Sequence, residues 1–197
     1  MLTHKSLLEA YVYAKDNCCL EMIHDIFEPN ALLAISVAGN AITFPPLVVG
    51  AEGIAQTLVT DFGRQYTQCC TYYLAEVPAA TGSRIDHLPW LVIMRDKAQA
   101  SLRIGRGSYR WLFSPHAKGW RISEMDIRID RMDVVPDPAG GLLATLQPLL
   151  SYPWLQPAAL DEAFSPLARC NPTFAFVSEF LSEKFERPGS EVISGLT

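Results

Sequence analysis

Charged side chains that could carry acid–base chemistry alternate in the segment EMDIRID. Side chains two residues apart in a strand point to the same face, so Asp126, Arg128 and Asp130 would share one face of a strand. If that face points inward, three buried charges require partners and mark a reactive site. If it points outward, they form a solvated face of mutually compensating ion pairs. The sequence leaves both interpretations open.

A histidine beside an aspartate is a second candidate for proton transfer. Asp86 and His87 stand just before Leu88, where a strand is predicted to begin. A neighbouring carboxylate can raise the pKa of an imidazole and make it an acid or base near neutral pH. His87 is therefore a candidate catalytic residue, with an ordinary surface-loop histidine as the alternative.

Aromatic residues gather on the same predicted strands and could shape a pocket. Tyr109, Trp111 and Phe113 share one strand face, and neighbouring strands carry further aromatic residues. Aromatic walls orient flat ligands, but they also suit a hydrophobic interface between subunits. We predict ligand-binding roles for five of these aromatic residues: Tyr72, Trp90, Tyr109, Trp111 and Trp120.

Composition restricts the classes of partner. The formal charge of -5 and the pI near 5.3 argue against a nucleic-acid surface, which needs clustered basic residues. The N-terminus reads as a helix instead of a signal peptide, and no apolar stretch is long enough to span a bilayer. The five cysteines match neither a metal knuckle nor a secreted disulfide framework. We expect a cytoplasmic protein with no membrane partner.

The sequence also lacks the patterns of a cofactor site. No histidines or carboxylates have metal-ligand spacing on a common element, and no glycine-rich phosphate loop is present. We therefore expect neither a metal nor a cofactor.

The order of elements predicts an α+β fold. Apolar periodicity predicts helices over residues 6–17, 20–27 and 51–62, with one strand at 31–37. Long strands follow at 67–77, 88–95, 100–113 and 120–134, and their short connections imply an antiparallel meander. Gly105 and Gly107 predict a bend or bulge. Such a sheet can curl around helices and leave a cavity.

Four segments, in this order and spacing, resemble one superfamily over about Leu2 to Asp133. They are LLEAYVYAKDN, DIFEPNALLAI, VVGAEGIAQTLVTDF and GRGSYRWLFSPHAKGWRISEMDIRID. The chain resembles the nuclear transport factor 2-like superfamily, in its SnoaL-like branch of polyketide cyclases and ketosteroid isomerase-like proteins. The resemblance implies a cone-shaped, curved antiparallel sheet with three N-terminal helices, a cystatin-like roll. It also implies a homodimer formed through the outer sheet face.

The resemblance further implies candidate chemistry. Tyr11 is similar in position to the helix tyrosine with which ketosteroid isomerases stabilise an enolate, although an ordinary core aromatic is the alternative. The matching carboxylate position falls near Ile35, where no acid stands. The run from Asp126 to Asp130 is similar to the acids and arginine of epoxide hydrolase relatives, which draw on more than one strand.

Three functions remain open. The first is a small-molecule-binding protein that catalyses a metal-free isomerisation, dehydration or cyclisation of an apolar or aromatic metabolite. The second is a non-catalytic ligand-binding protein, and the third is a dimeric assembly module with a filled interior. A fold alone cannot choose among them.

The chain divides by composition near residue 135. Residues 1–135 form the predicted cone domain, and eight of the 14 prolines lie from Pro136 onward. Residues 136–197 are predicted to form a proline-rich, mainly helical extension, with helices at 142–150 and after Asn171. Because this segment is rich in aromatic residues, we expect it to pack on the cone.

Overall fold

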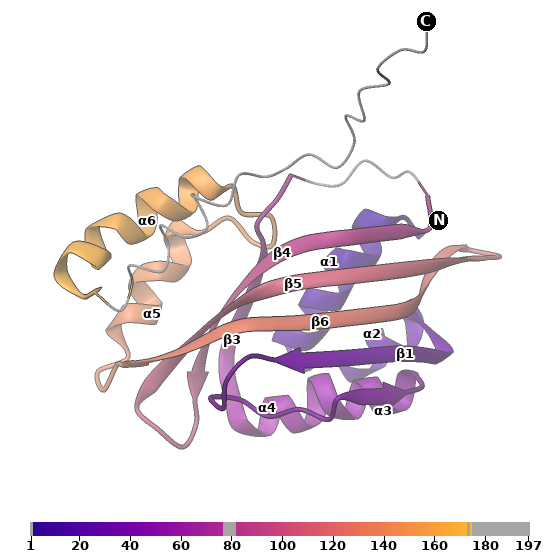
Figure 1. Cartoon of the computed structure of the whole chain (residues 1–197), viewed down its shortest axis with the longest axis horizontal. Helices are drawn as coiled ribbons and strands as arrows, with labels where there is room; N and C mark the ends of the chain where they lie inside the picture. Colours follow the sequence, from indigo (N-terminus) through magenta and orange to yellow (C-terminus); the bar gives the residue numbers. More distant parts are fainter. Residues whose placement is uncertain (1, 77–81, 173, 175–197) are drawn as a thin grey trace, which may run out of the picture.

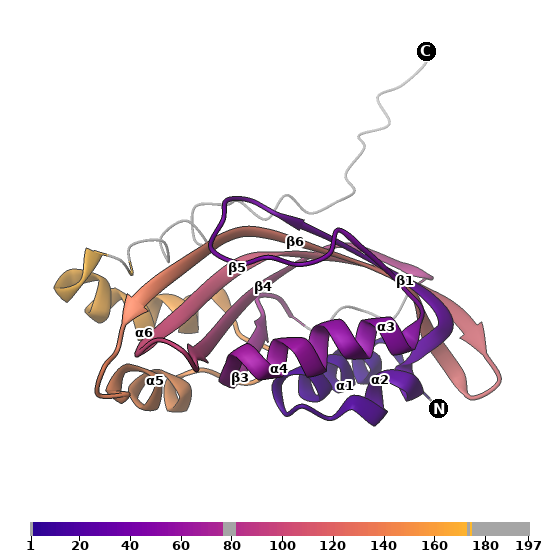
Figure 2. The same ribbon diagram turned by 90° about the horizontal axis from the view of Figure 1, so that it is seen from below.

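A computed structural model describes residues 2–76, 82–172 and 174 of the chain. Five helical elements form a layer on one side of a curved sheet (Figures 1 and 2). The helical layer contains α1 (His4–Asp16), α2 (Leu20–Ile26), α3 (Ala51–Ala55), the π-helix η1 (Gln56–Asp61) and α4 (Phe62–Gln65). The first helix is fixed at its start by Thr3, whose side chain accepts a hydrogen bond from the Ser6 backbone N–H.

Six strands form one open sheet in the order β2-β1-β6-β5-β4-β3. The strands are β1 (Phe27–Val37), β2 (Leu47–Val49), β3 (Tyr66–Tyr73), β4 (Arg84–Asp96), β5 (Ser101–His116) and β6 (Gly119–Pro136). The predicted antiparallel meander is confirmed from β3 to β6. The sheet as a whole is mixed, because β1 pairs parallel with β6. The expected α+β class is confirmed, with this correction to the wholly antiparallel sheet.

The first strand starts earlier than its sequence predicts. The spacing of apolar residues predicts that Phe27 is the last residue of the second helix, whereas in the structure it is the first residue of β1. Pro29 lies in this early part, where the register to β6 shifts between Phe27 and Leu32. A proline lacks the N–H that a regular ladder needs, and an irregular stretch tolerates that loss.

The predicted bend in β5 is confirmed. The register between β5 and β6 shifts at Arg106 and Gly107. A Cβ atom at Gly107 would stand 1.8 Å from the carbonyl oxygen of Arg128. Only glycine permits this close approach of two backbones, which lets the strands coil around the helices.

The two faces of the sheet bury different cores. The inner face packs on α1–α4, and its residues include Trp90, Tyr109 and Trp111. On the outer face, the side chains of β5 change from Leu102 and Ile104 to polar residues further along the strand. The apolar part of this face therefore needs a cover.

The C-terminal extension supplies that cover. It contains α5 (Gly141–Leu146), the 3-10 helix η2 (Gln147–Leu149) and α6 (Pro157–Cys170), which lie at one end of the sheet (Figure 1). Their apolar residues form a second core with outward residues of β3, β4 and β5, whose fully buried members include Leu91, Leu102, Leu146, Leu160 and Phe164. The helix predicted after Asn171 falls on residues of which only Pro172 and Phe174 are described.

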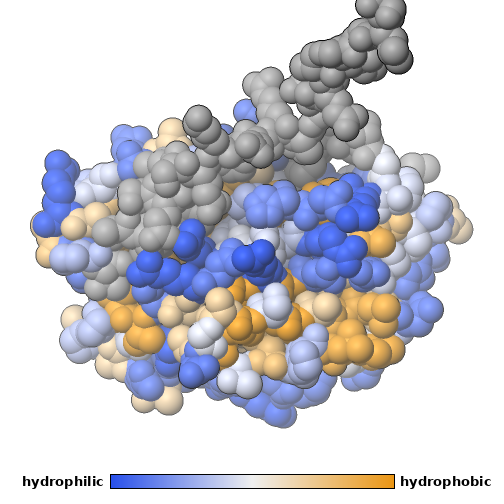
Figure 3. All heavy atoms as spheres, viewed as in Figure 1, coloured by the Kyte–Doolittle hydropathy of each residue, from blue (hydrophilic) through white to orange (hydrophobic). Residues whose placement is uncertain are grey.

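The rest of the outer face is polar. Hydrophilic side chains cover β5 and β6 in Figure 3, and an apolar patch lies over β1 and β2. That patch includes Leu32, Leu47 and Val49, whose exposed fractions are 40%, 59% and 64%. No helix in the described part of the chain is both long and apolar enough to cross a membrane.

Candidate functional site

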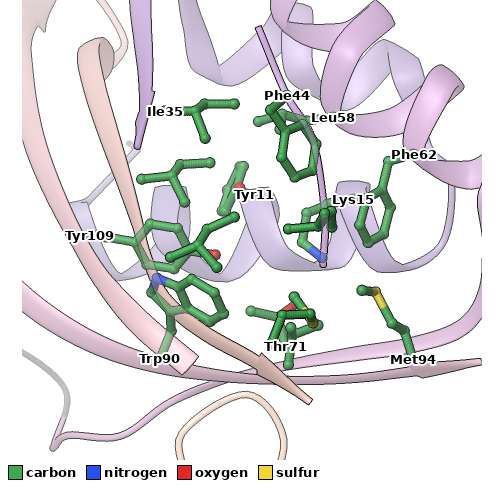
Figure 4. A pocket seen from close by; sticks show the side chains of 15 residues that line it. Tyr11, Lys15, Ile35, Phe44, Leu58, Phe62, Thr71, Trp90, Met94 and Tyr109 are labelled. Carbon is green, nitrogen blue, oxygen red and sulfur yellow. The ribbon is translucent and has the colours of Figure 1, made fainter. Parts of the chain in front are cut away.

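A small cavity lies between the first helix and the inner face of the sheet (Figure 4). Its volume is about 40 Å³, which is room for water molecules. Benzene occupies an engineered cavity of roughly 150 Å³, so an aromatic ligand requires the walls to move. Most wall residues are apolar, and the polar ones are Tyr11, Lys15, Thr71, Trp90 and Tyr109.

Helix α1 brings two of the polar wall residues together. Tyr11 and Lys15 are four residues apart, so their side chains leave the same face of the helix. Both residues are buried: the Tyr11 ring lies against Tyr109, whereas the Lys15 ammonium extends toward Phe62 and the strand that carries Thr71 (Figure 4). The helix thus directs one hydroxyl and one ammonium into an otherwise apolar space.

The Tyr11 hydroxyl is buried, and no hydrogen bond of regular geometry satisfies it among the residues that the structure describes. The Tyr109 hydroxyl is the polar group that interacts with it. The Tyr11 ring itself is held edge-on by Trp111 at 5.1 Å and by Tyr109 at 5.9 Å between ring centroids. Burial raises the pKa of Tyr11, and the nearby Lys15 ammonium offsets this only in part. Tyr11 therefore stays protonated near neutral pH and can donate a hydrogen bond.

A second buried donor on the cavity wall is also unsatisfied. The indole nitrogen Nε1 of Trp90 has no hydrogen-bond partner within residues 2–76, 82–172 and 174. The Trp90 ring stacks on Tyr109 at a centroid distance of 5.4 Å. Unsatisfied buried donors are uncommon because each costs free energy, so two on one cavity indicate a place for an acceptor.

A stacked pair of rings forms part of the cavity wall. Phe44 and Phe62 lie 6.5 Å apart at an interplanar angle of 16°. Both also line an outer groove of about 480 Å³, which lies beyond the ring pair. Phe62 directly follows the π-helix η1, a widened turn of a kind that often occurs at functional sites. The groove and the cavity therefore share the wall residues Ile42, Phe44 and Phe62.

A buried polar cluster next to the cavity was not predicted. Lys15 donates hydrogen bonds to Asp16 Oδ1 at 2.8 Å and to Cys69 Sγ at 3.3 Å, and Asp16 also binds Thr71 of β3. From sequence alone, two charged residues near the end of a helix would normally be predicted to be exposed to solvent. The one sequence signal for the burial of Lys15 is its position four residues after Tyr11, which places both residues on the same face of the helix.

The structure separates the predicted aromatic residues into different environments. Trp90 and Tyr109 line the cavity, and Trp111 packs against Tyr11 behind its wall. Tyr72 belongs to the core under the C-terminal extension, on the other side of the sheet. Trp120 contacts the ring of His4 at the start of α1 and does not line the cavity.

The predicted acid–base residues do not join Tyr11 at this cavity. His87 is exposed on β4, and the Asp86 carboxylate forms an ion pair with Arg84. Ile35 does line the cavity, so the wall carries an apolar residue where the isomerase-like resemblance would need an acid. Among the described wall residues, none is a histidine, aspartate or glutamate.

The alternating charges of β6 lie on the outer face. Asp126 pairs with Arg110 on β5, and Arg128 pairs with Asp130 along β6. Asp126 and Arg128 line a hollow of about 330 Å³, which shares the wall residues Ile35, Tyr109 and Ile127 with the inner cavity. This placement agrees with the solvated ion-pair interpretation of the segment. In the described part of the chain, no group of three or more His, Cys, Asp or Glu residues is placed to hold a metal ion.

Comparison with known proteins gives matches in structure only. No protein-family model and no curated protein sequence matches the chain. A nuclear transport factor 2-like superfamily protein from Salmonella enterica is 17% identical with a TM-score of 0.50, over 64% of this chain and 88% of that one.

Two further structures have similar scores. Hexachlorocyclohexane dehydrochlorinase LinA-type3 from Novosphingobium barchaimii LL02 is 11% identical with a TM-score of 0.51, over 66% of this chain and 85% of that one. A candidate scytalone dehydratase from Novosphingobium aromaticivorans DSM 12444 is 15% identical with a TM-score of 0.50, over 68% of this chain and 89% of that one. These likenesses show that the chain has the nuclear transport factor 2-like fold, as its sequence predicts.

Proposed function

We propose that this protein binds a small, flat and mainly apolar molecule that carries a hydrogen-bond acceptor, in the cavity beneath α1. The observation that carries the proposal is the buried Tyr11 hydroxyl on the cavity wall, which makes no hydrogen bond of regular geometry among the described residues and has the Tyr109 hydroxyl close by. The unsatisfied Trp90 indole N–H on the same wall supports it.

The energetics favour such a ligand. A buried polar group without a partner costs about 1–3 kcal/mol, and a ligand acceptor recovers that free energy when it binds. The remaining wall is apolar and includes Ile127, Ile129 and two flexible methionines, Met94 and Met132. Methionine side chains adapt readily to new shapes, so they offer a way to enlarge a 40 Å³ space for one aromatic ring.

Acid–base catalysis is the second candidate, with isomerisation or dehydration as the reaction. Its support is the protonated state of Tyr11, because a hydroxyl held in a mainly apolar cavity can stabilise an oxyanion as it forms. The structural neighbours include proteins named as a dehydrochlorinase and a candidate dehydratase. The described wall contains no carboxylate or imidazole to serve as a base, so we place binding ahead of catalysis.

A pair of isosteric probes tests the proposal. Acetophenone and α-methylstyrene have nearly the same shape, but only acetophenone has a carbonyl acceptor. We expect the protein to bind acetophenone about tenfold more tightly in calorimetric or NMR titrations, as one hydrogen bond to a buried donor predicts. Tyr11→Phe should remove this preference.

The control is another tyrosine on the same helix. Tyr13 is 49% exposed, so Tyr13→Phe should leave both affinities unchanged. The proposal fails if neither probe binds at millimolar concentration, or if Tyr11→Phe keeps the preference for the carbonyl. Turnover of a substrate by a protein that shows the Tyr11-dependent preference would move catalysis ahead of simple binding.

A further inference from the structure

Lys15 is a buried ammonium at the wall of the cavity. Its side chain is 7% exposed, and its Nζ lies 4.7 Å from the centroid of the Phe62 ring. Burial is the largest single effect and would lower the pKa of Lys15, but the opposing interactions, led by the Asp16 carboxylate, together outweigh it and the pKa is raised. The side chain therefore carries a full positive charge next to the proposed ligand.

Asp16, the ion-pair partner of Lys15, has no free position at which to accept another hydrogen bond. Asp16 Oδ1 accepts hydrogen bonds from Lys15 and from Thr71 Oγ1 at 2.9 Å. Its Oδ2 accepts from the Thr71 backbone N–H at 2.6 Å and from the Tyr152 hydroxyl at 3.2 Å. A carboxylate offers about four acceptor positions, so these four donors saturate it.

Lys15 itself retains donor capacity. An ammonium has three N–H groups, and its hydrogen bonds here go to one carboxylate and to the weak thiol acceptor of Cys69. Asp16 does not line the cavity, whereas Lys15 does. A ligand in the cavity therefore contacts the Lys15 ammonium and not the Asp16 carboxylate. Three neutral donors also bind that carboxylate: the Thr71 hydroxyl, the Thr71 backbone N–H and the Tyr152 hydroxyl.

One of these donors comes from the C-terminal extension. Tyr152 binds Asp16, and Trp154 Nε1 donates to Glu9 Oε1 at 2.8 Å, seven residues earlier on α1. Between them, the backbone carbonyl of Pro153 accepts a hydrogen bond from Tyr73 of β3. The segment 152–155 thus ties two turns of α1 to the sheet.

We propose that Lys15 recognises a ligand oxyanion of the carboxylate type, and that Tyr152 is a positioning residue that holds Asp16 and, through it, Lys15. This inference rests on the proposed binding function and specifies its ligand: a flat apolar body with an anionic head group. The head group meets donors on the helix side, the Lys15 ammonium and the Tyr11 hydroxyl, which leave α1 one turn apart.

Benzoate and nitrobenzene provide the test, because they are nearly identical in shape and differ in charge. We expect benzoate to bind at least tenfold more tightly than nitrobenzene, as a hydrogen bond to a charged donor predicts. Lys15→Met should abolish the preference. Tyr152→Phe should reduce it about threefold or more and leave nitrobenzene affinity unchanged.

Tyr152→Phe and one further variant, Trp154→Phe, keep the test decisive. Lys15→Met leaves the Asp16 charge without its cation and can prevent folding, whereas Tyr152 is 42% exposed and its hydroxyl can be removed safely. Trp154→Phe removes the neighbouring bond to Glu9 without touching Asp16, so it should keep the benzoate preference.

The possible results are distinguishable. If benzoate binds no better than nitrobenzene, or if a folded Lys15→Met and Tyr152→Phe both keep the preference, the inference is wrong. A Tyr11-dependent preference for acetophenone would then leave the proposed function intact. Failure of all four probes to bind would overturn the proposed function and this inference together.

Discussion

Removal of the Tyr11 hydroxyl should stabilise the unliganded protein, which is the opposite of the usual effect of truncating a buried side chain. Tyr11 is 0% exposed, and its hydroxyl makes no hydrogen bond of regular geometry among the described residues, so folding removes its water without a full replacement from the protein. Such a loss costs about 1–3 kcal/mol. The adjoining cavity has room for water, so we expect the lower end of that range, about 1 kcal/mol.

Tyr73 provides the matched comparison. It is also fully buried, but its hydroxyl donates a hydrogen bond to the Leu8 carbonyl oxygen at 2.9 Å. Tyr73→Phe removes the same single atom and should lower the free energy of unfolding by about 1 kcal/mol. The two variants should therefore change stability in opposite directions and differ by about 2 kcal/mol.

Urea denaturation without ligand measures both effects. Equal slopes for the wild type and both variants would show that the midpoints report stability alone. In thermal unfolding, Tyr11→Phe should raise the midpoint by about 2–4 °C for a chain of this size. If Tyr11→Phe destabilises the protein as much as Tyr73→Phe, the hydroxyl has a partner and the reasoning about the cavity is refuted.

Three other perturbations give further predictions. His4 is buried against Phe113, and burial lowers its pKa, so protonation of His4 opposes folding. The free energy of unfolding should therefore fall as the pH drops below about 6.5. His4→Gln should flatten this pH dependence in denaturation curves measured from pH 8 to pH 5. Gly107→Ala should cost about 3 kcal/mol because its Cβ would overlap a backbone carbonyl, whereas Gly141→Ala, with open space around it, should be neutral or stabilising by urea denaturation. Phe164→Ala should cost about 3–5 kcal/mol and increase dye binding to the exposed outer face; a loss under 1 kcal/mol would mean that the extension does not share the core of the sheet.

The strands of the fold could be predicted from sequence because their information is local. Alternating side chains and short connections define the meander from β3 to β6, and Gly107 marks its bulge. The parallel pairing of β1 with β6 is different, since it joins residues about 90 positions apart and leaves no local pattern. Periodicity shows which residues share a face but not which face points inward.

The candidate site was less predictable for the same reason. Tyr11 was identified because a family resemblance singles out its position on the first helix. Lys15 was missed because its burial depends on Asp16 and on Thr71, a residue 55 positions further along the chain. The cavity volume depends on how closely side chains such as Met94 and Met132 approach one another, which no sequence pattern specifies. The homodimer stays a prediction, and the extension already covers part of the face proposed for it.

Residues 152–155 of the C-terminal extension, which form hydrogen bonds to α1 and β3, also affect how the protein can associate with copies of itself. An open sheet ends in strands whose backbone groups can pair with another chain, and β3 is one of these two ends. Here Pro153 and Leu155 pair with the backbone of Tyr73, so this border of the sheet is partly occupied from within the same molecule. Growth of the sheet into a continuous fibre needs two free borders. Among the described residues, one border is the three-residue strand β2, and the other is partly occupied at Tyr73.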